Sequence, residues 1–124
     1  MTIRILVADH HTVFRYYLTR YLDFLDRDYA VVGEAESAAG ALVLVAARAP
    51  DLVLADLDLP DANGLHLARE LHRLLPGVAV IVLGNEPAAD YRPAALAAGA
   101  RAYVDKLDVV RGLPPALLAA GSPR

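Results

Sequence analysis

Five short runs of strand-forming residues alternate with segments of helical length, and this alternation is the strongest constraint on the fold. The runs are Ile3–Ala8, Tyr29–Glu36, Asp51–Asp56, Val78–Leu83 and Ala100–Val104. The first, third and fourth runs consist almost entirely of Val, Ile, Leu and Ala, so both faces of these strands are apolar. Strands of this kind belong to a parallel sheet that helices cover on both sides. The sequence therefore predicts an α/β fold with a doubly wound parallel sheet.

The segments between these runs carry the start and stop signals of helices. Ser37 and Asn63 stand where N-cap residues are expected. Gly99 stands where a glycine would end the fourth helix, and Pro76 with Gly77 closes the third. Apolar side chains at helical spacing give the third segment one hydrophobic face: Leu67, Leu71 and Leu74.

Prolines interrupt the last two helical segments. A proline inside a helix lacks the N–H that a helical hydrogen bond needs. We therefore expect the fourth helix to begin near Arg92 and Pro93, with residues 85–91 as a loop. The segment from Gly112 to Pro115 should leave a final helix of about two turns, starting near Pro114. Both helices are predicted to be short, which places the weakest part of the fold beside the fourth and fifth strands.

Composition limits the class of protein. The 124 residues predict a single domain, 1–124, and a hydrophobic content of 56% excludes disorder. The net charge is −3, which argues against a nucleic-acid-binding surface in this segment. Cysteine is absent, so disulfides and thiolate zinc sites are excluded. No signal peptide is recognised, and no stretch reaches the roughly 18 apolar residues of a membrane span. We expect a soluble, cytoplasmic protein.

Charged side chains follow the predicted strands at their carboxyl ends. Asp9 follows the first strand, Asp56 ends the third, and Lys106 follows the fifth. In an open parallel sheet, ligands bind beyond this edge, at the point where the strand order reverses. Facing carboxylates suit a hard cation such as Mg²⁺, and a lysine beside them suits an anion such as a phosphoryl group. Acids that recur at two strands argue against isolated surface carboxylates.

Other kinds of site receive little support. His10 and His11 are neighbours that we expect to point apart, and His66 and His72 lack the i, i+4 spacing of a helical zinc pair. The two serines of the chain do not stand at a strand-to-helix elbow, which argues against serine hydrolysis. The loop after the first strand reads DHHT and lacks the glycines of a mononucleotide or flavin site.

Three segments, in order along the chain, resemble the receiver domain of two-component response regulators, in particular the subgroup with a LuxR-type DNA-binding output. IRILVADHHTVFR is similar to the opening of that subgroup, which normally shows Ala-Asp-Asp-His. PDLVLADLDLPDANG resembles the phosphoacceptor segment, with Pro60 and Gly64 at the expected spacing after Asp56. AAGARAYVDK resembles the fifth-strand segment, with Tyr103 at the switch aromatic and Lys106 at the active-site lysine. The resemblance implies a flavodoxin-like, five-stranded sheet of order 2-1-3-4-5 with helices on both faces.

The resemblance also implies roles for individual residues. Asp56 would accept a phosphoryl group from the phosphohistidine of a sensor kinase, and Lys106 would contact the phosphoryl oxygens. Asp9 and Asp56 would belong to the metal site, together with the main-chain carbonyl of Asp58. Phosphoryl transfer passes through a highly charged transition state, so such a site mainly positions the group and supplies cations.

Two positions depart from the pattern of this family. His10 stands where a second acid, normally the direct Mg²⁺ ligand, is expected. Mg²⁺ prefers oxygen ligands, so His10 either leaves a weakened metal site or pairs with Asp9 or Asp56 and holds the site closed without metal. Gly84 stands where a Thr or Ser hydroxyl normally links the phosphoryl group to the switch aromatic. We interpret Gly84 as a loop glycine that is tolerated because the hydroxyl is no longer needed.

Two functional hypotheses follow from the resemblance. One is a conventional receiver that is activated when Asp56 is phosphorylated. The other, which we favour, is an atypical, non-enzymatic receiver of a transcriptional regulator, with weak Mg²⁺ binding and impaired or absent phosphorylation. DNA would be bound only through an output domain outside this chain. We also expect a homodimer, or docking to a partner protein, through the face formed by the fourth helix, fifth strand and fifth helix. Apolar side chains on that face are expected to be exposed: Leu113, Leu117 and Leu118.

Overall fold

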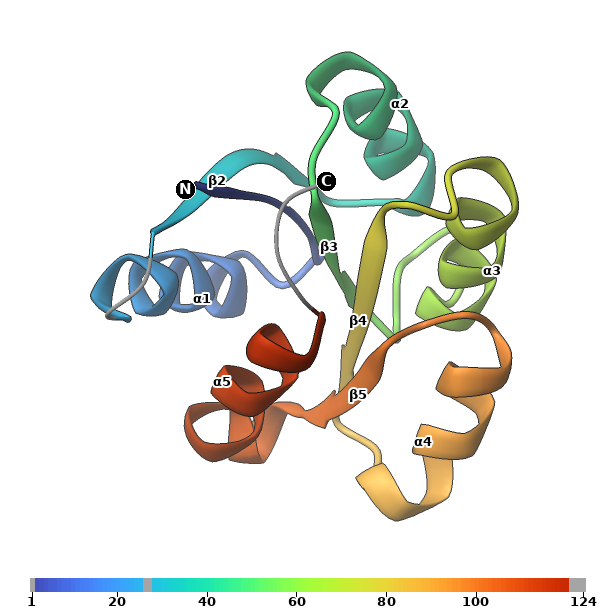
Figure 1. Ribbon diagram of the computed structural model, residues 1–124. Coiled ribbons are helices and arrows are strands. Elements are labelled where there is room, and N and C mark those ends of the chain that lie inside the picture. Colours follow the sequence, from blue (N-terminus) through green and yellow to red (C-terminus); the bar gives the residue numbers. More distant parts are fainter. Residues whose placement is uncertain (1, 26–27, 121–124) are drawn as a thin grey trace.

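A computed structural model describes residues 2–25 and 28–120 and contains one five-stranded parallel sheet (Figure 1). The strand order is β2-β1-β3-β4-β5, as predicted, and every neighbouring pair is parallel. The observed strands lie within two residues of the predicted ones at each end. Their bounds are β1 Ile3–Ala8, β2 Tyr29–Ala35, β3 Leu52–Asp56, β4 Ala79–Gly84 and β5 Ala102–Asp105.

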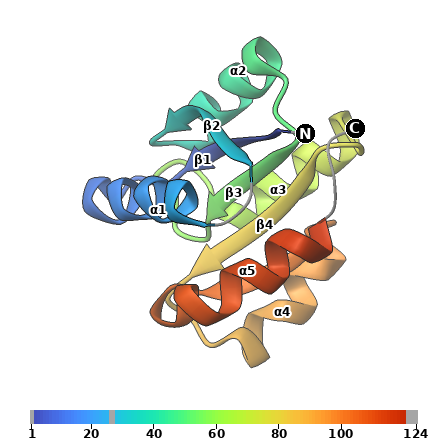
Figure 2. The same ribbon diagram turned by 60° about the vertical axis from the view of Figure 1, so that its left-hand side comes forward.

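Helices cover both faces of the sheet. Their bounds are α1 Thr12–Phe24, α2 Ala38–Arg48, α3 Gly64–Leu74, α4 Ala88–Ala97 and α5 Val109–Ala120, with a short 3₁₀ turn, η1 Lys106–Asp108, before α5. Helices α1 and α5 lie on one face, and α2, α3 and α4 lie on the other, as Figure 2 shows from a second direction. None of these helices, within the described ranges, is long and apolar enough to cross a membrane.

The sheet separates two hydrophobic cores, which explains why the first, third and fourth strands are almost entirely apolar. In β1, Leu6 and Ala8 enter the core beneath α2, α3 and α4, whereas Ile5 and Val7 enter the core beneath α1 and α5. Successive side chains of a strand point to opposite faces, so a strand between two cores needs apolar residues at every position. Because all five strands run parallel, their carboxyl ends lie together at one edge of the sheet.

The predicted helix caps are present. The side chain of Ser37 accepts a hydrogen bond from the N–H of Gly40, and that of Asn63 accepts one from the N–H of His66. Gly99 has a φ of 97°, the left-handed conformation expected where α4 ends. In α3, Leu67 and Leu71 are buried as predicted, but Leu74 is exposed because it lies at the end of the helix.

The prediction for the fourth helix is wrong. Helix α4 begins at Ala88, and Pro93 lies inside it rather than at its start. Residues 88–91 of the expected loop are helical because Ala88 and Tyr91 pack against the core, together with buried Ala95 at the same helical face, whereas residues 85–87 form a loop as expected. Tyr91 also stacks on Tyr103, with ring centroids 6.0 Å apart. This packing outweighs the hydrogen bond that Pro93 cannot donate.

The prediction for the last helix is also wrong. Helix α5 has 12 residues and contains both Pro114 and Pro115. It is not shorter than α2 and α3, which have 11 residues each. Leu113 and Leu117 are 0% and 1% exposed because they pack against the sheet, so only Leu118 of the three expected surface leucines is exposed. Burial of this face outweighs the disruption by the two prolines.

Candidate functional site

Three charged side chains meet at the carboxyl edge of the sheet. Asp9 directly follows β1, Asp56 is the last residue of β3, and Lys106 directly follows β5. The Nζ atom of Lys106 lies 2.8 Å from Oδ2 of Asp9 and 3.1 Å from Oδ1 of Asp56. All three residues are buried. The structure thus brings together the three residues that the strand ends predicted to be neighbours, although they come from distant parts of the chain.

The surroundings of Asp56 keep its carboxylate charged. Burial raises the pKa of Asp56, but the main-chain N–H of Asp58, which donates to Oδ1, and the ammonium of Lys106 together lower the pKa below its ordinary value. Lys106 also lies 4.4 Å from the centroid of the Phe14 ring, a distance at which the ring attracts a cation. The pocket therefore holds an ionised carboxylate next to a fixed positive charge.

The two histidines converge on the same carboxylate, contrary to the expectation that they point apart. Nδ1 of His10 and Nδ1 of His11 each lie 3.4 Å from Oδ2 of Asp56, and the two ring centroids are 4.0 Å apart. Nδ1 of His11 also lies 3.2 Å from Oδ1 of Asp9. The chain bends at His10 and enters α1 after His11, so side chains no longer alternate as they do along a strand.

Arg15 supports the pocket and was not predicted from the sequence. Its guanidinium donates to the main-chain carbonyl of Asp9 and pairs with Glu34 at 3.0 Å and Glu36 at 3.6 Å. These contacts tie the start of α1 to the end of β2 and hold the loop that carries the histidines. A single arginine on an amphipathic helix resembles an ordinary surface residue, so no sequence pattern indicates this role.

The donor set at this edge differs from the set that Mg²⁺ favours. The ligand-capable atoms of Asp9, His10, His11 and Asp56 all lie within 4.8 Å of one another. Mg²⁺ requires oxygen ligands in nearly octahedral geometry, but two of these four donors are imidazole nitrogens. The acidic cluster of a metal site is present, whereas the donor at position 10 does not fit Mg²⁺ well. The role of the Asp58 carbonyl stays a prediction.

Gly84 and Tyr103 form a second group beside the pocket. Gly84 is the last residue of β4 and pairs with Asp105 of β5, so it is not a loop residue as interpreted from the sequence. A Cβ atom at this position would lie 2.5 Å from the hydroxyl oxygen of Tyr103 and 2.9 Å from Cβ of Leu57. The glycine therefore makes room for the Tyr103 hydroxyl.

Tyr103 is fixed in this space. Its hydroxyl donates a hydrogen bond of 2.8 Å to the main-chain carbonyl of Glu86, and the residue is only 4% exposed. Burial raises the pKa of Tyr103 to about 12, and the nearby acids Asp105 and Glu86 act in the same direction. The aromatic side chain is therefore buried, neutral and hydrogen-bonded at the place where a Thr or Ser side chain stands in the family pattern.

Comparison with known proteins identifies the class. The family of the response regulator receiver domain matches residues 5–110, and the chain belongs to this family. It is 36% identical over 104 residues to the DNA-binding transcriptional activator DevR/DosR of Mycobacterium tuberculosis, covering 84% of this chain and 48% of that protein. The chain is a receiver domain similar to those of transcriptional response regulators, not an enzyme in the usual sense.

Solved structures agree with this assignment. The signal receiver domain of the response regulator NarL from Mycobacterium tuberculosis has a TM-score of 0.86 at 28% identity, covering 98% of each chain. A LuxR-family two-component response regulator from Aurantimonas sp. SI85-9A1 has a TM-score of 0.83 at 28% identity, covering 98% of this chain and 88% of that one. The chain spans about half the length of the curated relatives it matches.

Proposed function

We propose that this chain is an atypical receiver domain of a transcriptional response regulator, in which Asp56 is retained as phosphoacceptor and Mg²⁺-dependent phosphorylation is impaired. The observation that carries the proposal is the pair of imidazoles against Oδ2 of Asp56, at 3.4 Å each. Its partners are a sensor histidine kinase and, through an output domain outside residues 1–124, DNA. Such a regulator works in the cytoplasm.

The retained residues support a phosphoacceptor role for Asp56. Its carboxylate is ionised, and Lys106 and the N–H of Asp58 occupy Oδ1, which leaves Oδ2 as the attacking oxygen. Attack on the phosphohistidine of a kinase would form the new P–O bond and break the P–N bond, while Lys106 would neutralise charge on the phosphoryl oxygens. Oδ2 lies beneath His10 and His11, so these rings have to move before a donor can approach.

The conventional receiver is the second candidate, because the Asp9–Asp56–Lys106 arrangement is intact. Nuclear magnetic resonance separates the two. With Mg²⁺ and beryllofluoride, we expect small or no shifts around Asp56 in the wild type. His10→Asp replaces a nitrogen donor with a carboxylate and should restore both Mg²⁺ binding and the beryllofluoride shifts. Equal Mg²⁺ affinity in wild type and His10→Asp would overturn the proposal and favour the conventional receiver.

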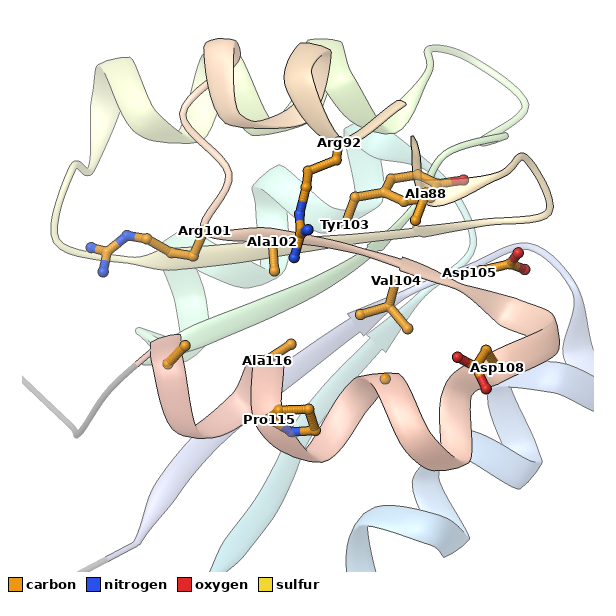
Figure 3. Close-up of a pocket in the computed structure, with 12 residues that line it drawn as sticks. Ala88, Arg92, Arg101, Ala102, Tyr103, Val104, Asp105, Asp108, Pro115 and Ala116 are labelled. Atoms are coloured by element: carbon orange, nitrogen blue, oxygen red, sulfur yellow. The ribbon is translucent and has the colours of Figure 1, made fainter. Parts of the chain in front are cut away.

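The α4–β5–α5 face supports a second part of the proposal, self-association without phosphorylation. A groove of about 470 Å³ runs between α4 and α5 over β5. Figure 3 shows Arg92 reaching into it from α4 and Pro115 of α5 opposite, with Arg101 toward one end and the acids Asp105 and Asp108 toward the other. Two copies related by a twofold axis through this groove would place basic ends against acidic ends.

The buried, hydrogen-bonded position of Tyr103 makes the conformation of this face independent of phosphorylation at Asp56. A ligand shifts a conformational equilibrium only when its contacts differ between the two states. Position 84 has no hydroxyl to contact a phosphoryl group, and Tyr103 is already buried and bonded to Glu86. Phosphorylation at Asp56 would therefore alter few contacts of β5, and the α4–β5–α5 face would keep one conformation.

Sedimentation at several concentrations tests this part. Wild type, Asp56→Ala and a beryllofluoride-treated sample should dimerise equally. Arg101→Glu should weaken the dimer because it reverses the charge at one end of the groove, whereas Arg69→Glu, an exposed position on α3, is the matched control and should not. A monomer that dimerises only with beryllofluoride, or equal effects of the two substitutions, would overturn the claim.

A further inference from the structure

Four side chains at the carboxyl edge, which we call the histidine–carboxylate cluster, have the composition of a transition-metal site. The cluster consists of Asp9, His10, His11 and Asp56, and its ligand atoms lie within 4.8 Å of one another. Imidazole and carboxylate together suit zinc and similar ions better than Mg²⁺. Cysteine is absent from the chain, so nitrogen and oxygen donors are the ones available.

The carboxylates of the cluster offer their oxygens in two directions. Oδ2 of Asp9 and Oδ1 of Asp56 face Lys106, at 2.8 Å and 3.1 Å. Oδ1 of Asp9 and Oδ2 of Asp56 face the histidines. A cation between the imidazoles and these outer oxygens therefore does not displace Lys106, which keeps neutralising the inner ones.

An unpartnered oxygen points into the cluster. Oδ2 of Asp56 is buried and accepts no hydrogen bond from any residue in the described parts of the chain. The side chain of Asp56 is 1% exposed, and Nδ1 of both His10 and His11 lies 3.4 Å from this oxygen. A buried carboxylate oxygen without a partner is costly, so its position next to two ring nitrogens favours the binding of a cation between them.

Three of the six separations among the four donors are close to those of tetrahedral coordination. With metal–ligand distances of about 2.0–2.1 Å, the donors of a tetrahedral zinc site lie about 3.3–3.4 Å from one another. In the cluster, Nδ1 of His11 lies 3.2 Å from Asp9, and both Nδ1 atoms lie 3.4 Å from Asp56, while all four donors lie within 4.8 Å of one another. We propose that the histidine–carboxylate cluster binds a divalent transition ion of the zinc class in tetrahedral geometry.

The ion has a route from solvent. The side chains of His10 and His11 are 38% and 47% exposed, whereas the carboxylates lie beneath them. The imidazoles can rotate outward, accept the ion as neutral ligands and close it against the two carboxylates. Without metal, protonated imidazoles would instead pair with Asp56 and hold the pocket closed, and this state is the competing outcome of the test.

Titration with Zn²⁺ and Co²⁺ tests the proposal on the whole chain. We expect the wild type to bind Zn²⁺ in the presence of excess Mg²⁺ and to give the intense visible absorption of tetrahedral Co²⁺. His10→Ala should weaken binding by at least the roughly 10–100-fold that loss of an outer-shell partner costs. His66→Ala is the matched control, because His66 is an exposed histidine on α3 outside the cluster, and it should bind as the wild type does.

Three results would overturn the proposal: no Zn²⁺ binding by the wild type, a weak octahedral Co²⁺ spectrum, or equal affinity in wild type and His10→Ala. Circular dichroism checks that His10→Ala is folded. If it is not, His10→Gln, which keeps a long side chain without the imidazole, is titrated in its place. The titration uses no phosphoryl donor. Its failure is therefore distinguishable from failure of the proposal on phosphorylation.

Discussion

Two regions lie beside each other at one edge of the sheet but depend on different interactions: the pocket of Asp9, Asp56 and Lys106, and the switch region, by which we mean Gly84 and Tyr103. Charge holds the pocket together, because Lys106 joins two buried carboxylates at 2.8 and 3.1 Å. Shape holds the switch region together, because the Tyr103 hydroxyl fills the space that the missing side chain of Gly84 leaves. Under the proposed function, the pocket keeps the groups for phosphoryl transfer, whereas position 84 lacks the hydroxyl that would link a phosphoryl group to Tyr103. The proposed loss of coupling therefore does not require loss of the phosphoacceptor.

The largest effect should come from removing the charge at the centre of the pocket. Lys106 is the only lysine of the chain, and its side chain is 5% exposed. Lys106→Met leaves two buried carboxylates without their cation, so we expect a loss of about 3 kcal/mol in the free energy of unfolding. Urea denaturation at neutral pH measures this loss. Arg69→Met on the surface of α3 should change stability by less than about 0.5 kcal/mol; equal losses would show that charge does not hold the pocket together.

The stability of the switch region should depend on the size of the side chain at position 84 and not on charge. Gly84→Ala adds a Cβ 2.5 Å from the Tyr103 hydroxyl oxygen, so either Tyr103 or Leu57 has to move. We expect a loss of about 2 kcal/mol, within the range of overpacked cores. Tyr103→Phe removes the clashing oxygen, and the double variant should therefore lose less than the sum of the two single losses. Strict additivity in this double-mutant cycle would contradict the proposed fit between Gly84 and Tyr103.

Acid should affect the pocket and leave the switch region unchanged. The pKa of Asp56 in the folded protein lies below its ordinary value of 3.8. The ionised carboxylate therefore contributes stability above pH 3.8, and this contribution is lost as the pH falls through the lower, folded-state pKa. Denaturation as a function of pH should show a flatter acid branch in Asp56→Asn than in the wild type. Tyr103→Phe should keep the wild-type slope, and a flattened slope there would link the two regions.

Much of the sheet and the pocket follows from local sequence patterns. Apolar residues at nearly every position of β1, β3 and β4 require burial on both faces, and parallel strands bring Asp9, Asp56 and Lys106 to one edge. The first residues of α4 and α5 could not be predicted from these patterns. Prolines are unfavourable for a helix locally, whereas the packing of Tyr91, Leu113 and Leu117 favours one. That packing depends on residues distant in sequence, which local patterns do not contain.

The two least predictable features of the site depend on side-chain directions. The convergence of His10 and His11 results from the bend between β1 and α1, and nothing in two adjacent histidines specifies that bend. The fit of Tyr103 into the space at Gly84 joins residues on neighbouring strands. A missing hydroxyl at position 84 can be noticed in the sequence. Only the structure shows that another hydroxyl has taken its place.

The smallest effect concerns the hydroxyl of Tyr103 itself. Its pKa is raised to about 12, chiefly by burial, so folding favours the neutral phenol. This contribution to stability is complete below the ordinary pKa of 10.0 and is lost as the pH rises through about 12. Titration by the ultraviolet absorbance of tyrosinate should therefore show a late ionisation step near pH 12 that belongs to Tyr103. That late step should be absent in Tyr103→Phe, which also loses the bond to Glu86 at a cost of about 1 kcal/mol. In Gly84→Ala the late step should move toward pH 10, because the added methyl group pushes the hydroxyl toward solvent. A late step that stays at the same pH in Gly84→Ala would mean that the glycine does not determine where the switch aromatic lies.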